Sequence, residues 1–269
     1  MGQTAFKIEC LVRYRVSKAM SKFHHAELPS CVLKPIIYAF EKSFKVDGDA
    51  FESREFSSFS DYFSRELKDI DQQRPIQDGL VSPVDADRVV VQEFEESNRV
   101  SVKSTDTNLR SFLGFELESQ DFFAIHFYLS PRNYHRIHCP LQNLTITDAR
   151  YLAGERLMID ALNVDFLSQN ERAVFKLQTP RKSEVYLVMT GAFCVGNIMF
   201  SPTKQVLDQA SIGSTLGVNF SKRQEMARFA FGSSVSLILP RAGYQLRPGF
   251  SWCNEAKVGQ SLCVSNSQH

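Results

Sequence analysis

The stretch QEMARFAFGSSVSLILP, residues Gln224 to Pro240, places Gly-Ser-Ser between two apolar runs. Runs of β-branched and aromatic residues on either side of a turn signal are typical of two β-strands. Taken alone, the glycine therefore predicts a hairpin turn. A second interpretation makes Ser233 a reactive hydroxyl, because Gly232 permits unusual backbone geometry and close approach. The stretch does not fit the G-x-S-x-G elbow of many serine hydrolases.

The same strand-like texture continues upstream to about Gly79. Short apolar runs are separated by turn signals such as Asp78-Gly79 and Ser130-Pro131. The runs are RVVVQEF (88–94), FFAIHFYL (122–129), LTITDARYL (144–152), RAVFKLQ (172–178) and EVYLVMTGAFCVGNIMF (184–200). Since no long helical stretch separates them, they predict a mostly antiparallel β core. The polar tail after Pro248 shows little pattern, and its order is left open.

The N-terminal part follows a helical period. Apolar residues recur every three to four positions over 8–23 and again over 36–44, which predicts two amphipathic helices. Pro35 suits the first turn of the second helix. A third helix is expected near Ser58, with Asp61 completing a variant of the capping box. This third segment is expected to bury four side chains, those of Phe59, Tyr62, Phe63 and Leu67. The fold class predicted is α+β, a mostly antiparallel β core with an N-terminal amphipathic helical segment.

Charge is distributed unevenly along the chain. The net charge is +1 overall, and this near-neutral balance argues against a nucleic-acid-binding protein. Residues 1–47 carry eight Lys or Arg against four Asp or Glu, a net charge of +4, so the remainder carries −3. The basic helices have two interpretations, packing against the core or lying on an anionic lipid surface.

The cysteines and the hydropathy give a broad setting. Six scattered cysteines with no CxxC pair and no preceding secretory signal favour reduced thiols in a cytosolic protein. No uninterrupted apolar run approaches the roughly 18–20 residues that a membrane-spanning helix needs. We therefore expect no transmembrane segment.

Two further stretches carry residues suited to chemistry. In VSPVDADRVV (81–90), Asp85 follows a proline turn and precedes a strand, although Asp85 and Asp87 taken alone are ordinary turn-formers. In FYLSPRNYHRIHCP (127–140), His135 and His138 are three residues apart. These histidines are either surface residues without a role or groups for acid–base work.

A zinc site at the two histidines and Cys139 is not predicted. Structural zinc takes four protein ligands and catalytic zinc usually three, and no other cluster supplies the rest at a recognised spacing. Asp85, a histidine and Ser233 are instead the parts of a proton-relay triad, in which the carboxylate orients an imidazole that takes the hydroxyl proton. The residues alone do not say whether these side chains meet in space.

Five motifs together resemble one enzyme family. They are SPVDADRVV, YLSPRNYHRIHCP, NERAVF (170–175), TGAFCVGNI (190–198) and QEMARFAFGSSV. In order and separation, from about Phe59 to Pro240, the chain is similar to phosphatidylserine decarboxylases. The basic N-terminal helices also resemble the membrane-facing segment of that family, with residues 1–70 as this segment and 71–269 as the catalytic domain.

The resemblance implies a self-processing proenzyme. The Glu-Met-x-x-Phe context assigns the cleavage site to Gly232 and Ser233 rather than to the similar Gly213-Ser214. Cleavage would give a β chain of residues 1–232 and an α chain of residues 233–269. Ser233 would become a covalent pyruvoyl group, the cofactor on which the substrate forms a Schiff base.

The resemblance also assigns roles to individual residues. Asp85, His138 and Ser233 would form the charge relay for self-cleavage, and His135 would be the candidate acid in decarboxylation. No metal is implied. The reaction would convert phosphatidylserine into phosphatidylethanolamine, a lyase step of phospholipid biosynthesis.

The partners implied are the phosphatidylserine substrate and an anionic phospholipid membrane surface, with no nucleic acid. The α and β chains would form a heterodimer, and further dimerisation is left open. The expected location is peripheral, on the cytoplasmic face of a bacterial cell membrane.

Three residues depart from the family pattern. Ser234 replaces the usual threonine, Ala227 replaces a glycine, and Ala86 stands where a glycine usually follows the aspartate. If that turn needs a positive φ, Ala86 would strain it and move Asp85. Two other functions therefore stay open, a lipid-surface binding protein that has lost processing and a serine hydrolase that uses the same triad.

Overall fold

A computed structural model of the chain describes residues 24–52, 54–94, 105–117, 121–159, 162–192, 197–230, 233–248 and 255–265. The first predicted helix, over 8–23, and the dipeptide 231–232 lie outside these described residues. Among the helices that are described, none combines the length and the apolar character needed to span a bilayer.

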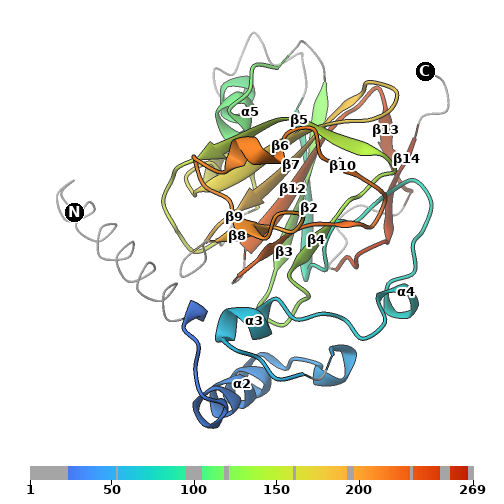
Figure 1. Cartoon of the computed structure of the whole chain (residues 1–269). Coiled ribbons are helices and arrows are strands. Elements are labelled where there is room, and N and C mark those ends of the chain that lie inside the picture. Colours follow the sequence, from blue (N-terminus) through green and yellow to red (C-terminus); the bar gives the residue numbers. More distant parts are fainter. Residues whose placement is uncertain are drawn as a thin grey trace.

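A seven-stranded sheet forms the centre of the molecule (Figure 1). Its order is β10-β5-β6-β7-β12-β3-β2, and each pair of neighbouring strands is antiparallel. In that order the strands are Asn219–Phe220, Leu144–Leu152, Arg172–Gln178, Glu184–Thr190, Ser233–Pro240, Phe122–Leu129 and Arg88–Phe94. The runs of β-branched and aromatic residues predicted six of these strands, all but β10, and the predicted mostly antiparallel α+β fold is confirmed.

Two smaller sheets accompany the large one. The four-stranded sheet has the order β4-β11-β8-β9, and the three-stranded sheet has the order β1-β14-β13. The first comprises Arg136–His138, Glu225–Phe229, Ile198–Phe200 and Gln205–Val206, and the second comprises Leu80–Val81, Ser261–Ser265 and Tyr244–Leu246. A short 3₁₀ helix, η3 (Ile212–Thr215), contacts β5.

Period-two alternation gives the large sheet two buried faces. One face contributes Phe127, Phe175 and Leu237 to a core shared with the smaller sheets. The other face contributes Val188 and Ile238 to a second core. Two helices, α5 (Thr105–Leu113) and α6 (Val164–Leu167), supply residues to that second core. The sheet is thus buried on both sides, which explains why its central strands read as nearly continuous apolar runs.

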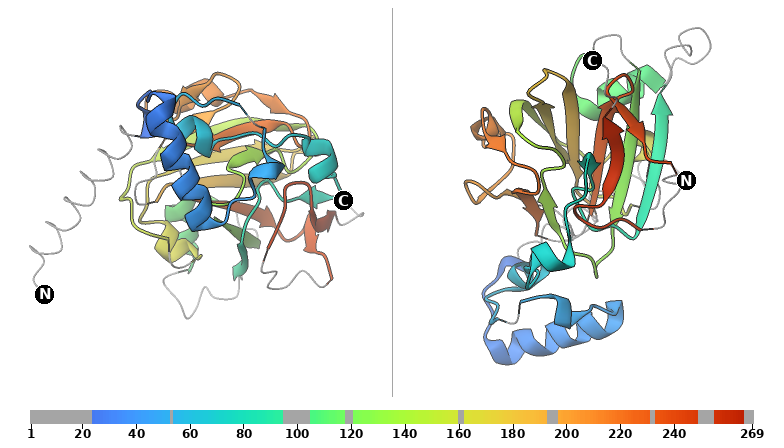
Figure 2. Two further views of the ribbon diagram at one scale, coloured as in Figure 1. Left: turned by 90° about the horizontal axis from the view of Figure 1, so that it is seen from below. Right: turned by 90° about the vertical axis from the view of Figure 1, so that its right-hand side faces the viewer.

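The remaining helices gather at one end of the sheets, where α3 lies close to the ends of β3 and β4 (Figures 1 and 2). They are α2 (Ser30–Phe44), the 3₁₀ turn η1 (Gly48–Ala50), α3 (Phe59–Phe63) and α4 (Ile70–Gln73). The predicted cap at Ser58 is confirmed, because its side chain accepts a hydrogen bond from the Asp61 amide. The placement of Pro35 was wrong: α2 begins at Ser30, directly after Pro29, so Pro35 lies inside the helix.

The Gly-Ser-Ser stretch is not a hairpin turn. β11 pairs with β4 and β8 in the four-stranded sheet, whereas β12 begins at Ser233 and pairs with β3 and β7 in the large sheet. The hairpin interpretation is therefore wrong, because the two strands that flank the stretch belong to different sheets. β11 ends at Phe229 in the four-stranded sheet, and β12 begins at Ser233 in the large sheet.

The tail after Pro248 supplies ordered structure. β14 lies between β1 and β13, and Ala256 exchanges two backbone hydrogen bonds with Ala86. Val258 is buried beside that bridge. The C-terminal residues thus reach the turn that carries Asp85.

Candidate active site

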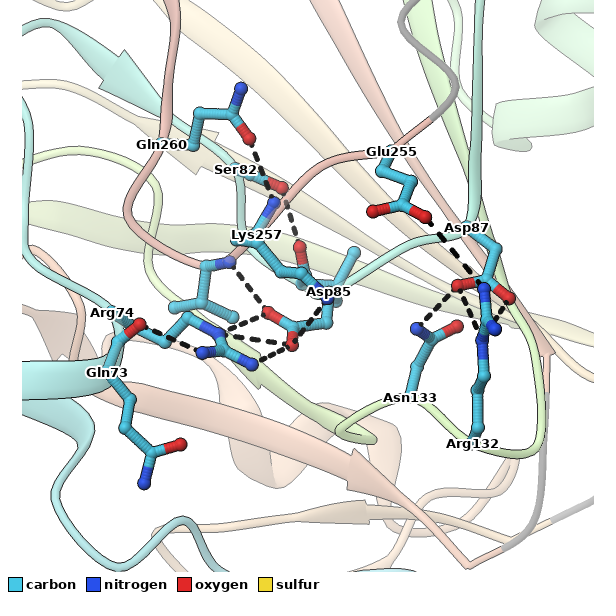
Figure 3. Close-up of polar contacts among 12 residues, drawn as sticks. Gln73, Arg74, Ser82, Asp85, Asp87, Arg132, Asn133, Glu255, Lys257 and Gln260 are labelled. Atoms are coloured by element: carbon cyan, nitrogen blue, oxygen red, sulfur yellow. Dashed lines mark hydrogen bonds and ion pairs between the residues drawn. The ribbon is translucent and has the colours of Figure 1, made fainter. Parts of the chain in front are cut away.

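Asp85 lies in a tightly held turn between β1 and β2 (Figure 3). The Ser82 hydroxyl donates to the carbonyl of Val84 at 2.7 Å, and the amide of Ala86 donates to the carbonyl of Ala256 at 2.9 Å. The Asp85 residue is 1% exposed. Positive φ values among the described non-glycine residues do not include Ala86, so the alanine imposes no left-handed strain on this turn.

Both carboxylate oxygens of Asp85 are occupied (Figure 3). Arg74 donates through Nε to Oδ1 at 3.0 Å and through Nη2 to Oδ2 at 2.6 Å. The Val258 amide donates to Oδ1 at 2.9 Å, and the Lys257 Nζ lies 3.7 Å from Oδ2. A two-nitrogen guanidinium contact of this kind fixes the orientation of a carboxylate as well as its position.

Asp87, two residues along, occupies a more open position. It accepts from the Arg132 Nε at 3.0 Å and from the Asn133 Nδ2 at 2.9 Å. Burial alone would raise the pKa of Asp87, but hydrogen bonds from Ser130, Arg132 and Asn133 outweigh it and lower the pKa. Arg132 is the most exposed member of this group, with 45% of its side chain exposed.

His138 lies on β4 close to the Asp85 turn. Its amide donates to the carbonyl of Pro83 at 2.8 Å, two residues before Asp85. The ring Nδ1 is 2.7 Å from the carbonyl oxygen of Arg223, and Nε2 is 3.0 Å from the hydroxyl of Tyr134, whose ring stacks on the imidazole. A carbonyl only accepts, so Nδ1 carries the proton and the Nε2 lone pair accepts from Tyr134.

The environment of His138 favours the neutral imidazole. Burial is the main cause of a lowered pKa, opposed by the hydrogen bond to the Arg223 carbonyl and by the charge of Glu225. The Nε2 atom is therefore available as a base near neutral pH once Tyr134 yields its hydrogen bond. Asp85 and His138 are neighbours through their backbones, but their side chains are not hydrogen-bonded to each other.

His135 is fully buried at the start of the same segment. Its Nδ1 donates to the carbonyl of Asn133 at 2.8 Å, and its Nε2 has no hydrogen-bond partner among the described residues. Burial, helped by the nearby Arg65 cation, lowers the pKa of His135 to about 3. The group is thus a neutral imidazole whose free nitrogen can accept a proton.

The helical end of the molecule covers His135. The ring of Phe63 packs against the imidazole with centroids 4.1 Å apart. Beside it, Arg136 donates to the carbonyl of Ser64 at 2.9 Å and bridges Glu66 and Glu225 at 2.7 and 2.8 Å. Because Ser64 and Glu66 both bind Arg136, the segment that follows α3 is held against the histidine-bearing segment.

The strands that flank the predicted cleavage site reach the histidine-bearing segment. Ser233 is the first residue of β12 and pairs with Leu129 at the end of β3. The amide of Phe229, four residues before Ser233, donates to the carbonyl of His135 at 3.1 Å. The side chain of Ser233 and the residue Gly232 lie outside the described residues, so the predicted cleavage site is located only by the strands that flank it.

A second serine–histidine contact lies in the core under α5 and α6. His126 Nδ1 is 2.7 Å from the Ser236 hydroxyl, and Nε2 is 3.2 Å from the Gln92 side chain. Both His126 and Ser236 are completely buried, and burial lowers the pKa of His126 to about 3. With every ring nitrogen satisfied inside the core, this pair holds strands together and offers no access to a substrate.

Sequence reasoning missed four groups of the site: Arg74, Tyr134, the Arg223 carbonyl and the Val258 amide. The two backbone groups leave no signal in the side-chain sequence. Tyr134 stands in the motif that carries both histidines, so its position was a usable signal. Within the described part of the chain, no group of three or more His, Cys, Asp or Glu side chains could hold a metal ion.

Comparison with known proteins identifies the family. The family model for phosphatidylserine decarboxylase matches residues 59–264. The chain belongs to the phosphatidylserine decarboxylase family. That match spans all three sheets and α3 to α6, so it covers every residue of the candidate site.

Individual members of this decarboxylase family align over most of the chain. A phosphatidylserine decarboxylase proenzyme of Psychrobacter cryohalolentis is 29% identical over 243 residues, which cover 85% of this chain and 86% of the relative. The Brevibacillus brevis proenzyme is 28% identical over 249 residues, covering 86% and 88%. A proenzyme of Helicobacter pylori strain Shi470 is 27% identical over 235 residues, covering 81% and 86%.

Proposed function

We propose that the chain cleaves itself at Gly232–Ser233 and then decarboxylates phosphatidylserine to phosphatidylethanolamine, a step of phospholipid biosynthesis. The observation that carries the proposal is the position of Ser233. It begins the central strand β12, and the preceding strand is hydrogen-bonded to His135 within the segment that also holds His138. The proposed nucleophile thus begins β12, and the proposed base lies on β4, which pairs with β11, the strand that precedes β12.

In the self-cleavage step, the Nε2 lone pair of His138 accepts the hydroxyl proton of Ser233. The Ser233 oxygen attacks the Gly232 carbonyl carbon, a C–O bond forms, the C–N bond breaks, and the amide is converted to an ester as the nitrogen takes a proton. Loss of the Ser233 α-proton then expels the carboxylate that ends residues 1–232. Hydrolysis of the remaining dehydroalanine releases ammonia and leaves a ketone.

The fold suits a break in the chain at this point. Residues before the break are held by β11 in the four-stranded sheet, and residues after it are held by β12 between β3 and β7. The 1–232 and 233–269 fragments would therefore remain associated as a heterodimer. The new terminus would keep its place beside His135, which supports Ser233 as the site of a pyruvoyl group.

When formed, the pyruvoyl group supplies an electron sink for decarboxylation, as pyridoxal phosphate does elsewhere. His135 is the proposed proton-transfer group. In the described state its Nε2 is a bare lone pair, so it must take up a proton before it can act as an acid. An anionic substrate beside the ring raises the pKa of an imidazole and would favour that uptake.

We propose a peripheral location on the cytoplasmic face of the membrane, and the helical end supports binding to a membrane surface. Val32, Tyr38 and Phe44 on α2 are large apolar residues with 44–66% of their surface exposed. The net charge of +4 on residues 1–47 would attract anionic lipid, with each Lys or Arg near the surface contributing about 1 kcal/mol. Binding at this end would bring phosphatidylserine close to the Phe63 cover over His135.

The test is carbon dioxide release from vesicles that contain carboxyl-labelled phosphatidylserine. The parent protein should release labelled gas, and hydroxylamine, which captures ketones, should stop it. Ser233→Ala should release none, whereas Ser214→Ala, in the other Gly-Ser pair, should match the parent. Vesicle binding without gas release would contradict the proposal and favour a lipid-binding protein. Ester hydrolysis that hydroxylamine does not affect would favour a serine hydrolase.

A further inference from the structure

The Asp85 carboxylate needs a partner, because it is one of the most deeply buried charges of the described chain. Its side chain is 2% exposed, whereas the Arg74 side chain is 15% exposed and that of Lys257 is 46% exposed. An unpaired buried charge is strongly destabilising. Arg74 supplies the close, two-nitrogen contact, and Lys257 at 3.7 Å supplies a more distant charge near the surface.

Arg74 is itself held in place from several directions. Its amide closes α4 by donating to the carbonyl of Ile70 at 2.9 Å, and its Nη1 donates to the carbonyl of Gln73 at 2.9 Å. Gly259 has φ of +83°, and a Cβ there would lie 3.0 Å from the Pro75 carbonyl oxygen. Glycine is thus required at 259 for the C-terminal tail to approach the Arg74 segment this closely.

Arg74 also connects to the histidine side of the site. The Arg223 Nη1 donates to the carbonyl of Arg74 at 3.4 Å, and the Arg223 side chain forms an ion pair with Asp71 on α4. The carbonyl of the same Arg223 receives the Nδ1 proton of His138. One arginine therefore contacts the carboxylate through its side chain and, through its carbonyl, the residue that orients the imidazole.

We infer that Arg74 is a positioning residue for self-cleavage that acts through Asp85. Its guanidinium holds the buried carboxylate in the turn beside His138, where the negative charge would stabilise the imidazolium that forms when His138 accepts the Ser233 proton. Without Arg74 the carboxylate would turn toward Lys257, and its charge would move away from His138. This inference rests on the proposed function.

The experiment is a double-mutant cycle on the rate of self-cleavage. Full-length chains are made by cell-free synthesis with a radioactive pulse, and the 1–232 fragment is followed on denaturing gels. The variants are Arg74→Gln, Arg74→Lys, Asp85→Asn and the double variant Arg74→Gln/Asp85→Asn. Arg132→Gln is the matched control, since it removes the arginine of the neighbouring Asp87 pair.

Arg74→Gln should cleave at least roughly 10-fold more slowly, a part of the 10²–10⁴-fold that a positioned base contributes. Arg74→Lys should be intermediate, because an ammonium restores the charge but not the two-nitrogen contact. The double variant should be no slower than Asp85→Asn alone, and Arg132→Gln should cleave at the parent rate. Cleavage by Arg74→Gln at the parent rate would overturn the inference. It would also be overturned if the loss of rate in the double variant equalled the product of the losses in the two single variants.

Folding is checked in the same arms by thermal unfolding of each variant in a Ser233→Ala background, where the chain stays uncut. If Arg74→Gln does not fold, the comparison moves to Arg74→Lys. A folded Arg74→Lys must then be slower than the parent when Asp85 is present, and Arg74→Lys/Asp85→Asn must cleave at the same rate as Asp85→Asn alone. Normal cleavage by Asp85→Asn would instead contradict the relay of the proposed function, which keeps the two failures distinguishable.

Discussion

Asp85 and Asp87 are two residues apart in VSPVDADRVV, yet they occupy different environments (Figure 3). Asp85 is sealed between Arg74 and the tail, next to the backbone that leads to His138. Asp87 faces the more exposed Arg132 and holds Asn133, whose carbonyl anchors His135. Each carboxylate is therefore linked to one histidine. The two carboxylates differ in burial, because the Asp85 side chain is 2% exposed and the Asp87 side chain is 21% exposed.

The difference shows what burial does to a charged pair. The Asp87–Arg132 pair is partly in water, where an ion pair contributes little because solvent competes for both partners. In the Asp85–Arg74 pair the carboxylate is almost fully enclosed, so loss of Arg74 leaves the buried Asp85 charge without its close partner. The same residue type is thus expected to be replaceable at one position and important two residues earlier.

The largest expected effect is on self-cleavage. Asp85→Asn should slow fragment formation by about 10²-fold or more, because the imidazolium of His138 loses its stabilising charge. Asp87→Asn should leave the rate within about 3-fold of the parent, since Asp87 touches neither His138 nor its partners. Pulse–chase gels measure both rates. Equal losses in the two variants would remove the distinction between the carboxylates.

The second effect concerns stability against pH. The pKa of His135 is lowered from 6.5 to about 3, so the unfolded chain binds the proton more readily than the folded one. The stability that depends on neutral His135 is complete above pH 6.5 and is lost as pH falls toward 3, by up to about 1.4 kcal/mol per pH unit.

Urea unfolding of the uncut Ser233→Ala chain between pH 7 and pH 5 measures this loss. In the same background, the unfolding free energy of His135→Gln should fall less steeply with decreasing pH. The difference in slope should correspond to at most one proton bound on unfolding. An unchanged slope would mean that the imidazole beside Phe63 is not held neutral. Asp87→Asn should leave the slope nearly as it is, because burial and not Asp87 is the main cause of the shift.

A smaller effect is expected at the exposed pair. Arg132→Gln should lower the free energy of unfolding by about 0.5 kcal/mol, the usual worth of a partly exposed ion pair. Arg74→Gln, measured beside it, should cost about 3 kcal/mol because the Asp85 charge is left buried. Denaturation midpoints in the Ser233→Ala background give both values. Similar costs at the two arginines would contradict the argument from burial.

The smallest effect is the acid side of the cleavage profile. Burial lowers the pKa of His138 below its ordinary 6.5, so the imidazole remains a base at pH 6.5. The rate of self-cleavage at pH 6.5 should therefore be more than half of the rate measured at pH 8. A midpoint at or above pH 6.5 in the pulse–chase series would show that His138 is not held neutral.

Much of the β core could be predicted from local pattern. The runs over 88–94, 122–129, 144–152 and 172–178 became strands because β-branched and aromatic residues fit a pleated, buried surface. The turn at Gly232 was misjudged for a physical reason. Local pattern shows that a strand ends and another begins, but it does not show that the two strands join different sheets.

The site was harder to predict because its contacts are distant in sequence. The motif resemblance selected Asp85, His138, His135 and Ser233, and their relay remains a prediction. Arg74 lies in a polar segment without periodicity, and Val258 contributes only an amide from a tail that shows little pattern. Such contacts arise when the tail packs on the turn, so they depend on tertiary structure that no local rule describes.

Mass spectrometry of the purified protein under denaturing conditions is the sharpest test of self-cleavage. Two fragments are expected, residues 1–232 and residues 233–269, the smaller one lacking a free amino terminus and carrying a ketone in place of the Ser233 amine. Ser233→Ala should give one intact chain, and Ser214→Ala should give the same two fragments as the parent. An intact parent chain that nevertheless releases carbon dioxide from phosphatidylserine would contradict the account.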